Sequence, residues 1–112
     1  MPEPTHADLA GGRWREMSLC EQLGNIGSEI SRASIARGAG NQVRMLKAVD
    51  RALELFDLTL ADPKLAGRRR EICRAREVVC DFYYGDNDYA SDEESLDRYF
   101  RFFAIAARAL RK

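Results

Sequence analysis

Residues 18–33 read SLCEQLGNIGSEISRA and predict an amphipathic helix with a defined start. Ser18 and Glu21 have the spacing of a capping box, in which each side chain accepts a hydrogen bond from a backbone amide of the first turn. Apolar side chains then recur at alternating spacings of four and three residues, which places them on one face of the helix. These residues are Leu19, Leu23, Ile26, Ile30 and Ala33.

Three further stretches have the same period, and turn signals separate them. Residues 38–41 precede the second stretch, Asp62-Pro63 precedes the third, and residues 85–95 precede the fourth. Proline is favoured at the first position of a helix, where its missing amide would have no partner in any case. The short connection at Asp62-Pro63 favours antiparallel packing of the second and third helices.

The fourth stretch also begins with the pattern of a capping box, formed by Ser91 and Glu94. A chain of 112 residues, of which 46% are apolar, is large enough to bury one core. Residues 1–12 have no periodic apolar set and predict a mobile tail. We therefore predict an all-α fold, a single-domain antiparallel four-helix bundle over residues 13–112 that follows a mobile N-terminal tail.

The charge composition argues against binding to nucleic acid or to anionic lipid. The chain has 18 basic and 18 acidic residues, so its formal net charge is zero and no overall field attracts a polyanion. Five arginines between positions 68 and 76 do not share one helical face. No apolar run reaches the roughly 20 residues of a membrane span, and the first residues lack a signal-peptide pattern. A cytoplasmic location is expected.

The histidine count excludes several catalytic and metal-binding patterns. The single histidine, His6, lies in the predicted tail. This position excludes the Glu-x-x-His pattern of di-metal bundles, a Cys–His nucleophile pair and the closely spaced Arg and His of HEPN-type ribonucleases. The acidic segment after Gly85 does not match an EF-hand loop, because Ser91 stands where glycine is required. We predict no cofactor and assign no catalytic or metal-ligating residue.

An all-carboxylate metal site is the alternative that the spacing leaves open. Oxygen-bearing side chains that suit a divalent cation share one flank of each of the first two helices. They are Glu21, Asn25 and Glu29 on the first, and Asp50, Glu54 and Asp57 on the second. All-helical nucleotide pyrophosphohydrolases hold magnesium in such clusters, although this chain lacks their Glu-Glu-x-x-Glu pattern. A carboxylate-based, divalent-metal-dependent hydrolase is therefore the second function hypothesis, against solvated flanks with salt bridges.

Two charged side chains are predicted at the edge of the core. Glu29 and Arg76 each lie within about 60° of the apolar centre of their helices. A half-buried charge without a partner costs several kcal/mol. Each is therefore expected to have an opposite charge or several hydrogen bonds, and to serve structure.

The segment between the third and fourth helices predicts an ordered turn. Asp86 and Asn87 can form hydrogen bonds with their own backbone, as such residues do in turns, and tyrosines flank them. This aromatic and acidic corner is a candidate contact for a ligand or a peptide. It comprises Tyr84, Asp86, Asn87, Asp88 and Tyr89.

The fourth helix is apolar over a wider arc than a bundle core needs. Phe102, Ile105 and Ala109 form a second stripe, roughly 100° to 160° from the core-facing centre. Contiguous apolar patches usually mark contacts, and the favoured cover is a second copy of the chain in a two-fold homodimer. The other cover is the N-terminal segment with Trp14 and Met17, so Trp14 is included in this candidate partner surface. Small residues of the first helix are a candidate second contact between copies, and they are Gly24, Gly27 and Ser31.

Three stretches resemble a family of small uncharacterised bacterial helical-bundle proteins. They are residues 21–30 (EQLGNIGSEI), residues 85–89 (GDNDY), and the fourth helix with Tyr99-Phe100 and residues 103–108 (FAIAAR). The resemblance covers most of residues 14–111. It implies a helical fold and no activity or catalytic residues. The sequence as a whole favours a non-enzymatic interaction or regulatory module that self-associates.

Overall fold

The computed structural model describes residues 12–110, and these residues form one all-helical body. The predicted all-α class is confirmed, and the described residues contain no strand. The elements are α2 (Arg13–Glu16), α3 (Leu19–Gly38), α4 (Gln42–Leu60), the 3-10 helix η1 (Pro63–Arg68), α5 (Arg69–Tyr83) and α6 (Glu93–Leu110). The mobile tail predicted over residues 1–12 lies outside the described residues, except for Gly12, which precedes α2.

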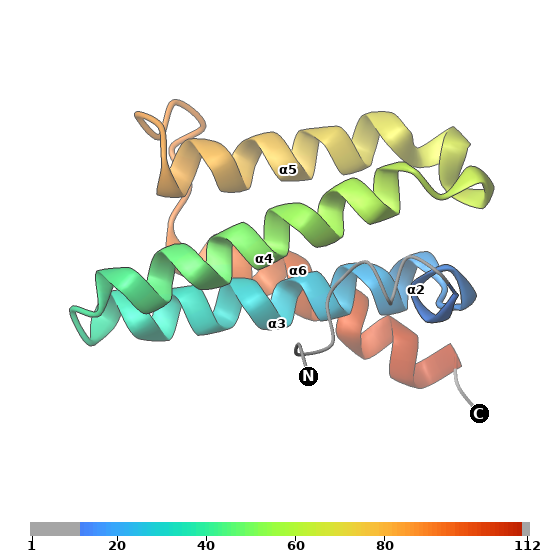
Figure 1. The fold of residues 1–112 in the computed structure, drawn as a ribbon, viewed down its shortest axis with the longest axis horizontal. Coiled ribbons are helices and arrows are strands. Elements are labelled where there is room, and N and C mark those ends of the chain that lie inside the picture. Colours follow the sequence, from blue (N-terminus) through green and yellow to red (C-terminus); the bar gives the residue numbers. More distant parts are fainter. Residues whose placement is uncertain (1–11, 111–112) are drawn as a thin grey trace, which may run out of the picture.

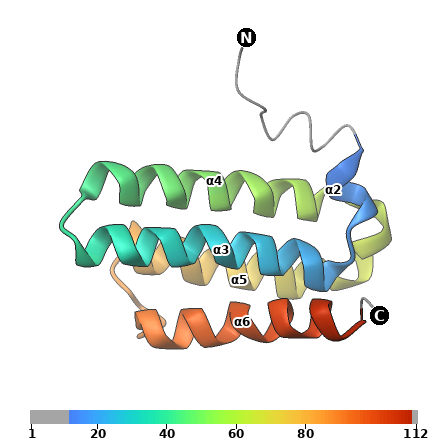
Figure 2. The same cartoon turned by 90° about the horizontal axis from the view of Figure 1, so that it is seen from below.

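The central element is α3, which packs against α4 on one side and α6 on the other. Figure 1 shows α5 beyond α4, and Figure 2 shows α3 between α4 and α6, with α5 behind it. The long helices alternate in direction along the chain, because short turns join α3 to α4 and α4 to η1 and α5. One hydrophobic core joins all four long helices.

Local capping explains where the first long helix begins. At the start of α3, Glu21 N donates to Ser18 Oγ over 3.1 Å and Ser18 N donates to Glu21 Oε1 over 3.0 Å. The predicted capping box is therefore confirmed. Asp62 caps η1 by accepting from the Lys64 amide, with Pro63 at the first position as expected.

The capping box predicted at the fourth helix is one residue out of place. Ser91 is held in the preceding turn, because it exchanges two 2.9 Å hydrogen bonds with the side chain of Asn87. The cap is instead formed by Asp92 and Ser95, where Ser95 N donates to Asp92 Oδ1 over 2.7 Å and Asp92 N donates to Ser95 Oγ over 3.1 Å. As a result, α6 begins at Glu93.

Two glycines of α3 allow α6 to approach closely. A methyl group at Gly27 would lie 2.5 Å from Phe100 Cβ, and one at Gly24 would lie 3.2 Å from Ala104 Cα. Both glycines therefore serve a contact within the chain. The prediction that this small-residue flank meets a second copy was wrong for Gly24 and Gly27, because α6 already occupies that side of α3.

A buried polar cluster ties the segment before α3 to the end of α4. Trp14 is only 1% exposed, and its indole nitrogen donates to Thr59 Oγ1 over 3.2 Å. Gln22 is fully buried, and its Nε2 lies within hydrogen-bond distance of Trp14 O, Met17 O and Asp62 Oδ2. The inclusion of Trp14 in an exposed partner surface was therefore wrong, because these contacts hold the ring inside the core.

Asp62 is the charged member of this cluster and is 2% exposed. Burial alone would raise the pKa of its carboxyl, but hydrogen bonds from Lys64 and Gln22 reverse that effect, and its pKa lies below the usual value. The Lys64 ammonium lies 2.6 Å from Asp62 Oδ2, so the charge has a partner. A half-buried carboxylate in this position therefore favours the folded chain above the ordinary Asp pKa.

Candidate functional site

The acidic flanks of α3 and α4 do not converge on a shared position. Glu29 faces Arg32 and Arg51, Asp57 pairs with Arg76, and Asp50 accepts from Tyr84. Across the described part of the chain, no three His, Cys, Asp or Glu side chains are grouped so that they could hold a metal ion. The geometry thus gives no support to the carboxylate-based hydrolase.

Glu29 and Arg76 lie at the edge of the core, in agreement with their spacing. The Glu29 side chain is 13% exposed and lies 3.0 Å from Arg32 Nη1 and 3.1 Å from Arg51 Nε. Arg76 is half-buried and lies 3.0 Å from Asp57 Oδ1. Each therefore has the opposite charge that partial burial requires.

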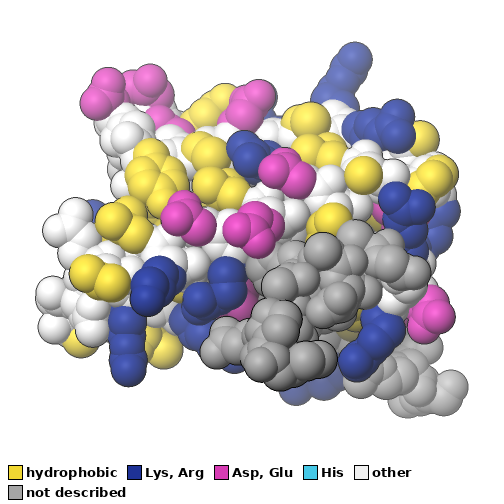
Figure 3. Space-filling model, in the orientation of Figure 1, with side chains coloured by type: hydrophobic (Ala, Val, Ile, Leu, Met, Phe, Trp, Pro, Cys, Tyr) yellow, Lys and Arg dark blue, Asp and Glu magenta, His cyan; other side chains and the backbone are white. Residues whose placement is uncertain are grey.

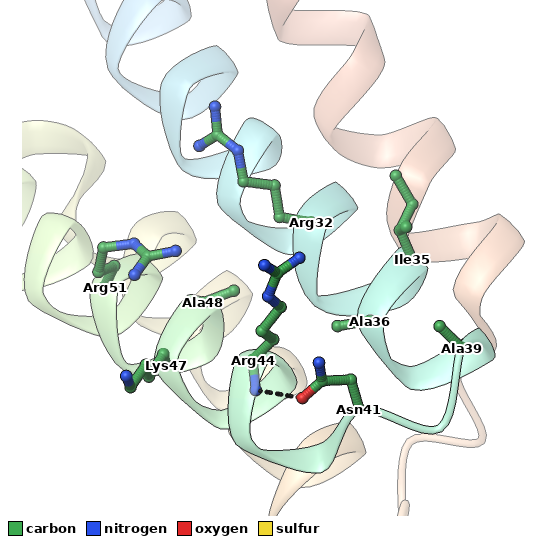
Figure 4. A pocket seen from close by; sticks show the side chains of 9 residues that line it. All are labelled: Arg32, Ile35, Ala36, Ala39, Asn41, Arg44, Lys47, Ala48 and Arg51. Atoms are coloured by element: carbon green, nitrogen blue, oxygen red, sulfur yellow. Dashed lines mark hydrogen bonds between the residues drawn. The ribbon is translucent and has the colours of Figure 1, made fainter.

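A basic cleft lies where the end of α3 meets the start of α4. It has a volume of about 490 Å³. Figure 4 shows the side chains that line it, which come from both helices and from the turn between them. They are Arg32, Ile35, Ala36, Ala39, Asn41, Arg44, Lys47, Ala48 and Arg51. Four of the nine carry a positive charge and none carries a negative charge, which sets the cleft apart from a chain with zero net charge.

The four cations of the basic cleft differ in their partners. Arg32 and Arg51 share one carboxylate, that of Glu29. Arg44 and Lys47 form no ion pair with any acidic residue of the described chain. Figure 3 shows Lys and Arg side chains gathered on the face of the molecule that carries α3 and α4. The cleft therefore has more positive charge than the folded chain neutralises.

The sequence contains a signal for this cleft that composition alone conceals. Each helix contributes four lining residues at positions i, i+3, i+4 and i+7, the spacing of one helical face. On α3 these begin at Arg32 and end at Ala39, and on α4 they begin at Arg44 and end at Arg51. Recognising that the two faces meet requires the turn that Asn41 sets when it caps α4.

The second apolar stripe of α6 is exposed to solvent in the single chain. Phe102 is 65% exposed, Ile105 is 52% exposed, and Ala109 is also exposed. The Phe102 ring touches the edge of the core through Phe103, with ring centroids 5.3 Å apart. Trp14 lies away from this stripe, against Thr59 of α4.

An apolar groove lies beside this stripe, between α5 and α6, with a volume of about 390 Å³. Ala75 and Val78 line it from α5, and Leu96, Tyr99 and Phe100 line it from α6. The groove exists because α5 packs mainly on α4 and η1 and makes little contact with α6.

The tyrosine and acidic corner is a turn closed by its own hydrogen bonds. Asp81 accepts from the amides of Asp88 and Tyr89, over 2.7 Å and 3.0 Å. Asn87 and Ala90 have φ angles of 57° and 51°, which lie in the left-handed region. These contacts support the predicted order of the turn, and Asp81, which the sequence analysis did not single out, organises it.

The side chains of this corner are also used within the chain. Tyr84 donates from its hydroxyl to Asp50 over 2.6 Å, and Tyr89 donates to Glu77 over 3.2 Å. The Arg74 guanidinium lies 4.9 Å from the centre of the Tyr89 ring. The side chains of Asp86 and Asp88 are exposed and do not point to a shared ligand position with a third acid in the described residues.

Comparison with protein-family models, with curated proteins and with solved structures found no match to this chain. Over the described residues, no helix combines the length and the apolar character that crossing a bilayer requires. Function must therefore be argued from the surfaces described above.

Proposed function

We propose that the chain is a non-enzymatic interaction module, an antiparallel four-helix bundle that associates with a second copy of itself through the outer stripe of α6. The observation that carries this proposal is the exposure of Phe102 and Ile105, which are 65% and 52% accessible and one helical turn apart. Covering a large apolar side chain contributes about 1.5–3 kcal/mol. A two-fold interface counts each side chain twice.

The charges along α6 favour a second copy as the partner. Its first turn carries Glu93 and Glu94, and its last turn carries Arg108. If two copies of α6 pack antiparallel about a two-fold axis, the acidic end of each lies opposite the basic end of the other. Phe102 lies near the middle of Glu93–Leu110, so the same axis brings the apolar stripes together.

Sedimentation equilibrium is the direct test. We expect the wild-type chain to be a dimer and the variant Phe102→Glu/Ile105→Glu to be a monomer, because the new carboxylates would have to be buried unpaired. The matched control is Ile35→Glu/Val43→Glu, which changes two side chains that are 71% and 66% exposed on other helices. This control should remain a dimer.

The helical content of both variants, measured by circular dichroism, should match that of the wild type, because all four positions are solvent-exposed in the single chain. A monomeric wild-type chain at high micromolar concentration would overturn the proposal. So would a dimer that survives the change at Phe102 and Ile105.

A further inference from the structure

We propose that the basic cleft of α3 and α4 binds the polyphosphate group of a small ligand, either inorganic or attached to a nucleoside. The structural basis is the juxtaposition of Arg32 on α3 with Arg44, Lys47 and Arg51 on α4 around one cavity. This site is separate from the α6 stripe and does not depend on self-association.

The charge of the cleft favours an anionic ligand. Arg32 and Arg51 have only the shared carboxylate of Glu29 among the described residues, and Arg44 and Lys47 have no acidic partner there. Four cations and one carboxylate leave a local excess of three positive charges. Like charges held together repel each other, and a bound polyanion removes that repulsion while it accepts charge-assisted hydrogen bonds.

The chemistry of the donors favours phosphate over a carboxylate or a halide. Three of the four cations are arginines, whose planar guanidinium donates two parallel hydrogen bonds to phosphate oxygens. Arg32 and Arg51 are held by the half-buried Glu29, which leaves further N–H groups of each guanidinium free to donate. A di- or triphosphate has enough charge and enough oxygens to engage these groups together.

The size and floor of the cleft favour a small molecule. A cavity of about 490 Å³ is within the range of small-ligand pockets. Ala36 and Ala48 are buried and form an apolar floor, and Ile35 is a 71% exposed apolar side chain at the rim. Such a rim suits a ligand that has an apolar or planar part next to its phosphates.

The surroundings of the cleft argue against an extended nucleic acid. A nucleic-acid backbone needs a track of cations along several phosphates. Beyond Arg51, the outer side of α4 carries Glu54 and Asp57, and the whole chain has 18 basic and 18 acidic residues. The positive surface is therefore confined to the cleft.

Isothermal titration calorimetry with sodium triphosphate, ATP and AMP tests the proposal, in a buffer without phosphate or divalent cations. We expect triphosphate and ATP to bind with a stoichiometry of one per chain, and AMP to bind more weakly. The variant Arg44→Gln/Lys47→Gln should bind at least about tenfold more weakly, since each lost charge-assisted contact is worth a substantial part of a decade or more in affinity. The control Arg13→Gln/Arg70→Gln removes the same charge from exposed sites elsewhere and should bind as the wild type does.

Two further arms make the result decisive. The Phe102→Glu chain should retain wild-type affinity, so that loss of self-association and loss of ligand binding are distinguishable. Equal weakening in the control variant would mean that binding follows net charge alone and would overturn the proposal. Absence of binding would also overturn it, as would binding of single-stranded RNA by a wild-type chain that does not bind triphosphate. Tighter binding of ATP than of triphosphate would assign the nucleoside form, and equal affinity would assign the polyphosphate itself.

Discussion

Replacing Gly27 with alanine should destabilise the chain, although the same replacement stabilises most helices. Alanine has the higher helix propensity, by about 0.5–1 kcal/mol over glycine. At Gly27, however, the added methyl carbon would lie 2.5 Å from Phe100 Cβ. Carbon atoms in contact are normally about 3.5–4.0 Å apart, so the two atoms would be about 1 Å too close.

This overlap has no inexpensive relief. Phe100 is 3% exposed and packs edge-on against Phe56, so its backbone is fixed within the core. Because the clashing atom is the Cβ, every residue except glycine at position 100 keeps it, and trimming Phe100 to leucine should not rescue the variant. Overpacking of this kind costs about 1–3 kcal/mol. We therefore expect Gly27→Ala to lower the free energy of unfolding by up to about 2 kcal/mol after the propensity gain.

The same helix provides matched controls. A methyl group at Gly38 meets no atom within 4 Å, so Gly38→Ala should be neutral or stabilising. Gly24→Ala should fall between the two, since its methyl would lie 3.2 Å from Ala104 Cα. Urea unfolding followed by circular dichroism measures all three at constant chain concentration.

The order Gly38, Gly24, Gly27 in decreasing stability is the expected outcome. A Gly27→Ala chain as stable as the Gly38→Ala chain would refute the reasoning, because α3 and α6 would then not approach as closely as described. Rescue of Gly27→Ala by Phe100→Leu would also contradict it, since the leucine retains the Cβ.

Two further substitutions test the buried polar groups. Tyr83→Phe should raise the free energy of unfolding by about 1 kcal/mol, because the Tyr83 hydroxyl is buried and has no hydrogen-bond partner among the described residues. Burial raises the Tyr83 pKa to about 12, so the wild type should lose stability as the pH rises from about 10 towards 12, and absorbance titration at alkaline pH should show less of this loss in the variant. Asp62→Asn should cost about 1–3 kcal/mol at neutral pH, because the carboxylate accepts from Gln22 and Lys64. Since the folded-state pKa of Asp62 is lowered, its contribution is present above the ordinary Asp pKa and is lost as the pH falls through the folded-state pKa, so acid unfolding of the variant should be less steep.

The sequence predicted those features that depend on neighbouring residues. The Ser18–Glu21 cap and the Asp62-Pro63 start need only a few consecutive positions, and both are present. The cap at Ser91 was misplaced because Ser91 and Asp92 both suit an N-cap. The contact that decides between them is the pair of hydrogen bonds from Asn87, which depends on the shape of the turn.

Features that join distant segments were missed or misread. Gln22 shares a helix with residues of the solvated flank, yet it is fully buried because Asp62 and the backbone around Trp14 supply acceptors from elsewhere. Small residues such as Gly27 indicate a close approach without naming the partner, which is α6 of the same chain. The basic cleft was overlooked because its cations are divided between two helices, and a search along one helix at a time finds no cluster.

The weak coupling of α5 to α6 has a consequence for how the molecule opens. An element that rests mainly on one neighbour has fewer contacts to break, so it forms a natural unit of partial unfolding. The segment η1 with α5 can separate from α4 while α3, α4 and α6 keep their shared contacts. Its amide protons are therefore expected to exchange with solvent through openings smaller than global unfolding, ahead of those in α3. Such openings would widen the groove beside Tyr99 and leave the basic cleft at the opposite side of α4 intact.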